Sequence, residues 1–314
     1  MVETPSLVVA VLTFRRPQDL AALLPLLTAQ LVAVGDLHPL ARVLVVDNSP
    51  EAGARDLVAR TPGPVDYAHE PVAGIAAARN RALDEARSDD LLVFIDDDER
   101  PTEGWLRALL GERSRSDAVV VAGPVVSSFA VPPGPFVAAG RFFDRRRLPT
   151  GSPIDVAATN NLLLDLRKVR GLGLRFDPAT GATGGEDTLF TRSVHARGGR
   201  MTWCDEAVVH DIVPAARITP RWVLLRALSS GNSWSLTSLQ LAEGLPAQLR
   251  TRLALHALGL IRIAGGTAQA AVGALLGRPY HRARGVRTAA RGAGMLLGAW
   301  NVRYREYRRP SANR

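Results

Sequence analysis

The sequence predicts an α/β protein, a mostly parallel sheet flanked by helices, followed by a helical extension. Three observations indicate this. Short apolar runs alternate with helix-like segments through the first hundred residues, which is typical of a parallel sheet covered on both faces. Three of these runs end in polar or acidic residues, at Thr13, Asp47 and Asp96. After Pro220 the pattern changes to helices rich in Ala, Leu, Gly and Arg.

The first half alternates regularly. Continuous apolar runs bounded by polar residues are typical of buried parallel strands. Helical spacing of apolar residues, with Pro17 suited to a helix start, predicts the segments between them. The expected strands are Leu7–Leu12, Val43–Val46, Val65–Ala68 and Leu91–Ile95, and the expected helices are Asp19–Leu31, Ala52–Ala59 and Gly74–Arg87.

The second half is less regular. Residues 129–155 are rich in Pro, Gly and Arg and are expected to be irregular. The other expected segments are a helix at Trp105–Leu110, a strand at Ala118–Ser127, an apolar segment at Ala158–Leu166, a glycine-rich turn at Gly181–Glu186, a helix at Asp187–Ala196 and a strand within Met201–His210.

Charge is distributed unevenly along the 314 residues. Residues 217–314 hold sixteen arginines and two glutamates, a net charge of +14, whereas the whole chain carries +9, so residues 1–216 carry −5. We therefore expect a catalytic domain at 1–216 and a basic helical extension at 217–314. A basic segment suits nucleic acid, an anionic membrane or an anionic ligand. Nucleic acid is disfavoured, because no binding motif is present and aromatic residues make up only 5%.

The run Asp96-Asp97-Asp98-Glu99 closes an apolar strand. Open α/β sheets bind ligands at the carboxyl ends of their strands. Clustered carboxylates repel one another, and Mg²⁺ or Mn²⁺ relieves that repulsion while bridging to phosphates. In an extended segment Asp96 and Asp98 point the same way. The triple Asp leaves the register open, and a solvated acidic turn is the alternative.

Five motifs occur in a recognisable order: Thr13–Pro17, Val45–Ser49, Glu70–Asn80, Asp96–Pro101 and Gly184–Asp187. Together they resemble the glycosyltransferases of family 2, and especially the succinoglycan-biosynthesis β-glucosyltransferase subgroup. The resemblance covers about residues 5–235. It implies the GT-A fold, an α/β domain that binds nucleotide-diphospho-sugars, with the basic helices following it.

The resemblance also implies a nucleotide-sugar site. Asp47 would accept a hydrogen bond from the base of a uridine-type nucleotide, although Asp-Asn-Ser is also good turn chemistry. Arg79 would face the nucleotide or diphosphate, or else lie on a solvated helix face. The full expected set is Thr13, Arg15, Asp47, Arg79, Asn80, Asp96 and Asp97.

The remaining implied roles concern metal, catalysis and the acceptor. Asp98 and Asp96 would bind the divalent metal, and His210 would complete the site or be a structural histidine. Asp187 would be the general base with Glu186 supporting it, although acids are also favoured at any helix start. The expected acceptor-side residues are Asn160, Asn161 and Trp203, Trp203 alternatively being a core aromatic.

The expected function is an inverting, metal-dependent glycosyltransferase in polysaccharide or glycoconjugate biosynthesis. Its donor would be a UDP-type nucleotide sugar and its acceptor a saccharide or a lipid-linked saccharide. The alternatives are a basic-tailed nucleic-acid or membrane binding protein, or another α/β nucleotide-using enzyme. We expect a cytoplasmic protein, peripheral at the inner face of the cell membrane. Arg262 interrupts the apolar stretch 253–276, which favours a surface-lying or bundled helix over a simple span. A helical cap is the alternative role for the extension.

Overall fold

The structure is a computed structural model that describes residues 5–180 and 184–304. It divides into two compact units. Unit 1 comprises residues 1–127, 145–178 and 186–212, and unit 2 comprises residues 128–144, 179–185 and 213–314. The longest segment of unit 2 begins at residue 213, and the other two segments fall within the range 1–216 that was expected to form the catalytic domain.

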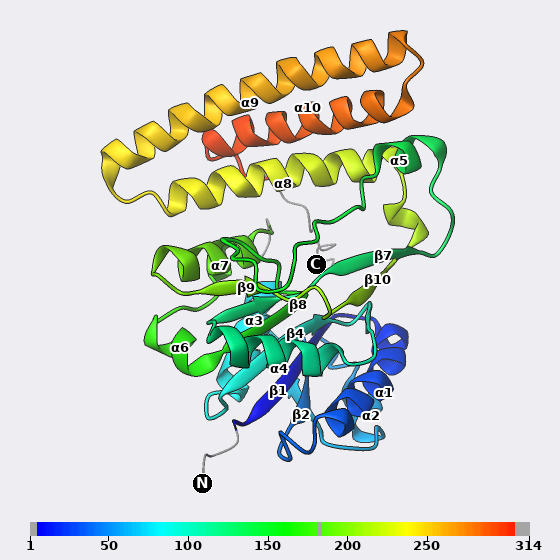
Figure 1. Ribbon diagram of the computed structural model, residues 1–314, viewed down its shortest axis with the longest axis vertical. Coiled ribbons are helices and arrows are strands. Elements are labelled where there is room, and N and C mark those ends of the chain that lie inside the picture. The colour runs from blue at the N-terminus through cyan, green and yellow to red at the C-terminus, as the bar shows by residue number, and fades with distance from the viewer. Residues whose placement is uncertain (1–4, 181–183, 305–314) are drawn as a thin grey trace. The chain divides into compact units, whose positions relative to one another are not determined.

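Unit 1 is built on a seven-stranded sheet in the order β3-β2-β1-β4-β8-β6-β9 (Figure 1). Neighbouring strands are parallel, except that β8 runs antiparallel to both β4 and β6. The strands are β1 (Leu7–Thr13), β2 (Arg42–Asp47), β3 (Val65–His69), β4 (Leu91–Asp96), β6 (Val120–Ala122), β8 (Asn161–Asp165) and β9 (Met201–Trp203).

Helices cover both faces of this sheet. One apolar cluster joins alternate β1 residues such as Val9 to α1 (Pro17–Ala33), α2 (Arg55–Ala59) and α4 (Trp105–Ser116). The other joins the opposite β1 residues, such as Val8, to α3 (Ile75–Glu85), α6 (Leu166–Gly171) and α7 (Glu186–Ala196). Alternation of side chains along a strand explains the division. The mostly parallel sheet with flanking helices is confirmed, and α6 is an addition to the expected elements.

The register places three strand ends together. Thr13 of β1 pairs with Asp47 of β2, and Leu12 pairs with Asp96 of β4. The polar residues that end the three expected strands therefore lie along one edge of the sheet. This edge holds most of the predicted site.

A second sheet has the order β5-β10-β7, with β5 (Glu99–Pro101), β7 (Val125–Phe129) and β10 (Val209–Val213). Two expected strands are each divided. The segment 118–127 forms β6 and β7 in different sheets, and 201–210 forms β9 and the start of β10. His210 consequently lies inside β10, paired with Arg100, and does not end a strand as expected.

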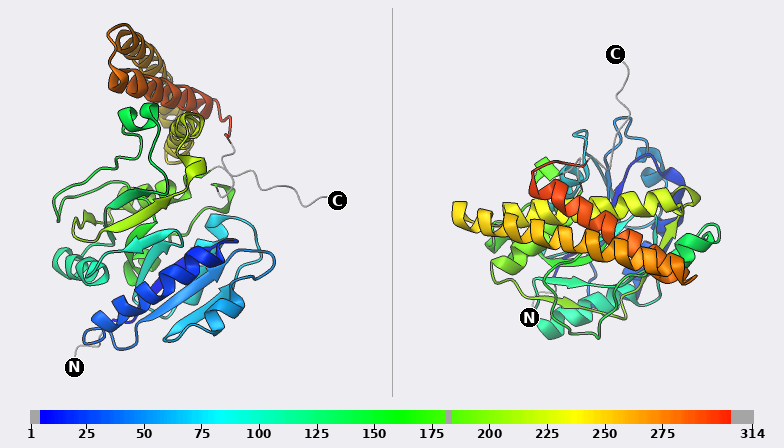
Figure 2. Two further views of the ribbon diagram at one scale, coloured as in Figure 1. Left: turned by 90° about the vertical axis from the view of Figure 1, so that its right-hand side faces the viewer. Right: turned by 90° about the horizontal axis from the view of Figure 1, so that it is seen from above.

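Unit 2 contains α5 (Pro135–Gly140) and three long helices, α8 (Pro220–Gln240), α9 (Gly244–Leu275) and α10 (Pro279–Ala299). In this unit α10 packs between α8 and α9 (Figures 1 and 2). Glycines make the contacts close: a Cβ at Gly294 would lie 1.9 Å from Leu228 O of α8, and one at Gly266 would lie 2.7 Å from Gly285 O. Val137 of α5 joins an apolar cluster with Val213, which explains why residues 128–144 belong to this unit.

Candidate active site

The first part of the site is the end of β1 against the acidic run. Thr13 is buried, and its hydroxyl donates a hydrogen bond of 2.8 Å to Asp97 Oδ2. The next residues form a turn in which Arg15 takes a φ of 55° and its backbone N–H donates to Ser49 Oγ. The Arg15 side chain is exposed and pairs with exposed Glu51. Thr13 thus helps to fix the acidic run, whereas the Arg15 side chain lies at the rim of the site, on the protein surface.

Asp47 is fully buried at the end of β2. Its carboxylate accepts hydrogen bonds from Ser49 N at 2.9 Å, Ala54 N at 2.8 Å and Tyr67 Oη at 3.2 Å. These bonds fix the loop that follows the strand. The carboxylate has no exposed surface here, so direct contact with a nucleotide base would require this loop to move.

Arg16 was not among the predicted site residues. Its Nη1 lies 2.9 Å from Asp97 Oδ1 and 2.7 Å from Asp98 Oδ2. Burial lowers the pKa of Arg16, but the charges of Asp97 and Asp98 outweigh this and raise it. Burial is also the main cause that raises the pKa of Asp97. Arg16 therefore neutralises part of the carboxylate repulsion. Its place in the motif Thr13–Pro17 indicates a loop residue but not the contact with the acidic run, which forms only on folding.

The Glu99 side chain fixes the backbone of Asp96. The Asp96 N–H donates to Glu99 Oε2 at 3.1 Å, and Asn160 Nδ2 donates to Glu99 Oε1 at 2.6 Å. Burial raises the pKa of Asp96 to about 7, opposed by Arg79 and reinforced by Asp98 and Asp97. Burial, and then the charge of Asp96, raise the pKa of Glu99 well above its usual range. Asn160 thus acts on the acidic run through Glu99.

A buried guanidinium joins the acidic run to the start of α7. Arg79 of α3 forms an ion pair with Glu186, and both side chains are 7% exposed. Burial lowers the pKa of Arg79, but Glu186, Asp187 and Asp96 together raise it. Its guanidinium also lies 5.5 Å from the centre of the Phe176 ring. Arg79 is therefore the positive centre of a carboxylate cluster, and the solvated-helix alternative is wrong.

Asp187 lies in the first turn of α7, partly exposed, with its Oδ1 accepting from Thr188 N at 2.6 Å. Two glycines with positive φ, Gly184 at 72° and Gly185 at 94°, precede the helix, while residues 181–183 lie outside the described part of the chain. Burial raises the pKa of Glu186, and among the described residues the buried Glu186 Oε2 has no hydrogen-bond partner. Asp187 is the more accessible carboxylate of the two.

Three predicted contacts need correction. Both ends of the Asn80 side-chain amide bind the backbone of Phe176, at 2.8 and 3.0 Å, so Asn80 anchors that segment and does not face a nucleotide. Asn161 is buried and bonds to Trp105 Nε1, Pro124 O and Ala207 O, which uses its amide inside the core. Trp203 is 5% exposed in the apolar core and therefore offers no sugar platform.

The donor set fits a divalent metal in part. Within residues 5–180 and 184–304, no three His, Cys, Asp or Glu side chains are grouped so that they could hold an ion, so Asp96, Asp98 and His210 do not form a ready three-residue site. Mg²⁺ in nucleotide sites is, however, commonly held by one or two carboxylates together with phosphate oxygens. Asp96 and Asp98 supply hard oxygen ligands of that kind, and Asp98 is 14% exposed.

Comparison with known proteins identifies the family of the chain. The family model "Glycosyl transferase family 2" matches residues 8–162. The chain is 35% identical over 247 residues to the succinoglycan biosynthesis protein ExoM of Rhizobium meliloti (strain 1021), covering 77% of this chain and 78% of that protein.

Two solved structures share the fold. GalNAc-T7, crystallised with UDP, GalNAc and Mn²⁺, superposes with a TM-score of 0.52 at 14% identity, covering 81% of this chain but only 55% of that one. The S. aureus TarS 1–349 structure superposes with a TM-score of 0.50 at 15% identity, covering 92% and 90%. At these identities the likeness concerns the GT-A fold. The sequence matches go further: the chain belongs to glycosyltransferase family 2 and is a glycosyltransferase.

Proposed function

We propose that this enzyme is an inverting, metal-dependent glycosyltransferase that uses a nucleotide-diphosphate sugar, with UDP-type donors favoured. The observation that carries the proposal is the carboxylate cluster at the end of β4, beside the end of β1, whose charge Arg16 and Arg79 offset in part. A diphosphate brings negative charge to an acidic site, which requires cations. A divalent metal at Asp98 and Asp96 would offset the diphosphate charge and stabilise the leaving group.

The proposed catalytic step uses the start of α7. Asp187 would accept the proton of an acceptor hydroxyl as that oxygen attacks the anomeric carbon. The bond from that carbon to the diphosphate oxygen breaks, and the nucleoside diphosphate leaves with the electron pair. General-base assistance of this kind contributes roughly 10²–10⁴-fold to the rate. Attack opposite the leaving group inverts the anomeric centre.

Supporting roles follow from the contacts. Glu186 forms an ion pair with Arg79. The charges of Asp96 and Asp187 both act on Arg79, which can therefore position the metal-binding acid Asp96 relative to the base Asp187. Thr13 and Glu99 fix the acidic run. Arg15, at the rim, is available to a nucleotide, and His210 lies on β10 beside β5, which continues the acidic run.

We propose a saccharide or lipid-linked saccharide as the acceptor, in polysaccharide biosynthesis at the cytoplasmic face of the cell membrane. The supports are the similarity to a succinoglycan biosynthesis protein and the basic, apolar extension. Because Asn161 and Trp203 are buried in the core, we propose that other residues contact the acceptor.

A thermal-shift screen tests the donor. UDP-, GDP- and dTDP-sugars are added with and without Mn²⁺, since a ligand at a hundred times its Kd stabilises the fold by about 2.7 kcal/mol. We expect one nucleotide class to raise Tm, and to do so more strongly with Mn²⁺. Absence of a shift with any of them would contradict a nucleotide-sugar donor, and equal shifts with all three classes would contradict the preference for UDP-type donors.

A further inference from the structure

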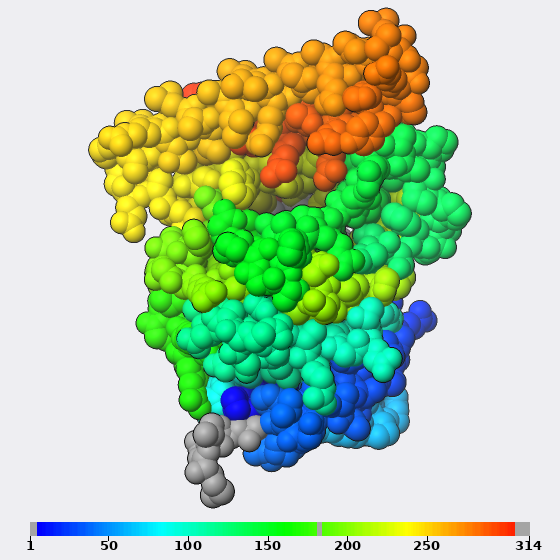
Figure 3. Space-filling view, viewed as in Figure 1, coloured from blue at the N-terminus to red at the C-terminus, as the bar shows by residue number. Residues whose placement is uncertain are grey.

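The outer side of α9 is apolar and uncovered in unit 2. Between residues 253 and 276 the exposed positions are all apolar or glycine, except Thr267. Leu253 is 70% exposed, Leu260 58%, Ile261 65% and Leu275 85%. Figure 3 shows the surface of α9, in yellow to orange, from one side. At 1.5 Å per residue the face is about 36 Å long, and monomeric soluble proteins rarely expose so large a continuous apolar patch.

The ionisable side chains of this segment turn away from that face. Arg262 Nη1 lies 2.7 Å from Met295 Sδ of α10, so the charge that interrupts the sequence run does not interrupt the surface. His256 lies edge-on to the Trp300 ring, with 5.1 Å between ring centroids. The apolar face is therefore continuous, although Arg262 and His256 interrupt the apolar run in the sequence.

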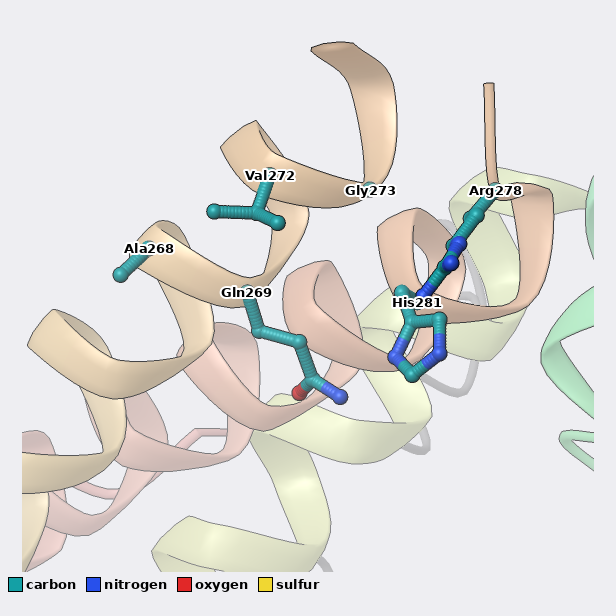
Figure 4. Close-up of a pocket in the computed structure, with 6 residues that line it drawn as sticks. All are labelled: Ala268, Gln269, Val272, Gly273, Arg278 and His281. Carbon is teal, nitrogen blue, oxygen red and sulfur yellow. The ribbon is translucent and has the colours of Figure 1, made fainter. Parts of the chain in front are cut away.

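Positive charge marks both ends of the face. Arg250 and Arg252 precede it, and Arg278, Arg282 and Arg284 follow it. A surface pocket of about 270 Å³ adjoins its C-terminal end. Figure 4 shows Gln269 and Val272 on one side of this pocket and Arg278 and His281 on the other. A guanidinium beside an amide and an imidazole suits a phosphate group, with an apolar chain continuing along the helix.

The helix is long and apolar enough to cross a membrane by length and composition. Its packing argues against crossing. Gly259, Gly266 and Gly273 bring it into close contact with α10 along its length, and α10 carries Arg282, Arg284, Arg287 and Arg291. A crossing α9 would take these charges into the hydrocarbon, which is unfavourable. A helix lying in the interface, with its apolar face in the acyl chains, avoids this.

We propose that α9 lies in the plane of an anionic phospholipid leaflet, with its exposed apolar face among the acyl chains and the pocket at Arg278 holding a lipid phosphate. The positive charge of the flanking arginines complements an anionic leaflet. The assignment of this leaflet to the cytoplasmic face of the cell membrane rests on the proposed function. Lipid binding itself does not, since it needs no catalysis.

Co-sedimentation of the full chain with vesicles tests this. We expect binding to vesicles of phosphatidylglycerol mixed with phosphatidylcholine, weaker binding to pure phosphatidylcholine, and a decrease as NaCl is raised. Leu260→Glu should weaken binding about tenfold or more. Arg278→Gln should weaken binding to the anionic vesicles about fivefold. Leu40→Glu, which changes an 80% exposed leucine of unit 1, should leave binding unchanged.

Each variant is compared with wild type by thermal unfolding, so that a folding defect is not read as a lipid effect. Absence of binding by a well-folded wild type overturns the proposal. So does a dimer, seen by light scattering without lipid, that Leu260→Glu dissociates, because the face would then join two copies. Retention on vesicles after alkaline extraction would indicate a spanning helix and also overturn it. Vesicle binding by a protein that transfers no sugar would refute the catalytic proposal alone.

Discussion

Replacing Arg79 with methionine removes one partner of a buried ion pair and should strongly destabilise the catalytic unit. Arg79 and Glu186 are each 7% exposed, and one buried oxygen of the Glu186 carboxylate has no hydrogen-bond partner in the described part of the chain. Removing one member of a buried pair costs about 3–5 kcal/mol, because the remaining charge stays buried. For a unit of this size, about 2–4 °C per kcal/mol corresponds to a fall in Tm of about 6–20 °C.

The assay is urea unfolding of Arg79→Met, Glu186→Gln and the double variant. The double variant should be less destabilised than the sum of the single variants, since the neutral glutamine no longer needs a counter-charge. Arg175→Met is the matched control: its ion pair with Asp84 is 53% and 56% exposed, and it should lose at most about 1 kcal/mol. A loss for Arg79→Met no larger than for Arg175→Met would show that the buried pair does not have the role argued here.

Three further outcomes are expected. Asp187→Asn should bind UDP-sugar with near wild-type affinity, measured by calorimetry. Its transfer rate, measured by UDP release, should fall about 10²–10⁴-fold, and wild-type turnover would exclude Asp187 as the general base. Because burial raises the pKa of Asp96 from 3.8 to about 7, the Asp96 carboxyl binds more protons in the folded ligand-free protein than in the unfolded chain between those values. The contribution of Asp96 to the unfolding free energy should therefore fall as pH rises through this window, and a pH series of urea unfolding should lack this contribution in Asp96→Asn. Asn161→Ala should lose about 1–3 kcal/mol of stability in the same assay, because Trp105 Nε1 and two carbonyls lose a buried partner; an unchanged midpoint would contradict its structural role.

The fold of unit 1 was largely predictable, because buried parallel strands leave continuous apolar runs. Leu7–Thr13, Arg42–Asp47 and Leu91–Asp96 match the expected strands to within two residues at either end. The segments 118–127 and 201–210 were each predicted as one strand, but each contains parts of two strands in different sheets. An apolar run does not reveal where the chain leaves one sheet for another, although Gly123 and Pro124 lie at the division in the first segment.

The site was partly predictable. Acids at a strand end indicated Asp96 and Asp98 from local pattern, whereas the roles expected for Asp98 and Asp187 came from the family resemblance and stay predictions. The partners of Asn80, Asn161 and Trp203 lie far away in the sequence, so no local pattern distinguishes a core amide from one that faces a ligand. Arg16 and Glu99 were missed because their importance comes from a network of contacts formed only on folding.

Calorimetric titration of UDP into wild type and Asp98→Asn, with and without Mn²⁺, examines the donor site at the ends of β1 and β4. Wild type should bind UDP at least about tenfold more tightly with Mn²⁺, because the metal links the Asp98 carboxylate to the diphosphate. The variant should lose that difference while unfolding at the wild-type temperature or above it, since Asp98 is part of a repelling carboxylate cluster. Unchanged Mn²⁺ dependence in Asp98→Asn, or metal-independent UDP binding in wild type, would contradict this account of the site.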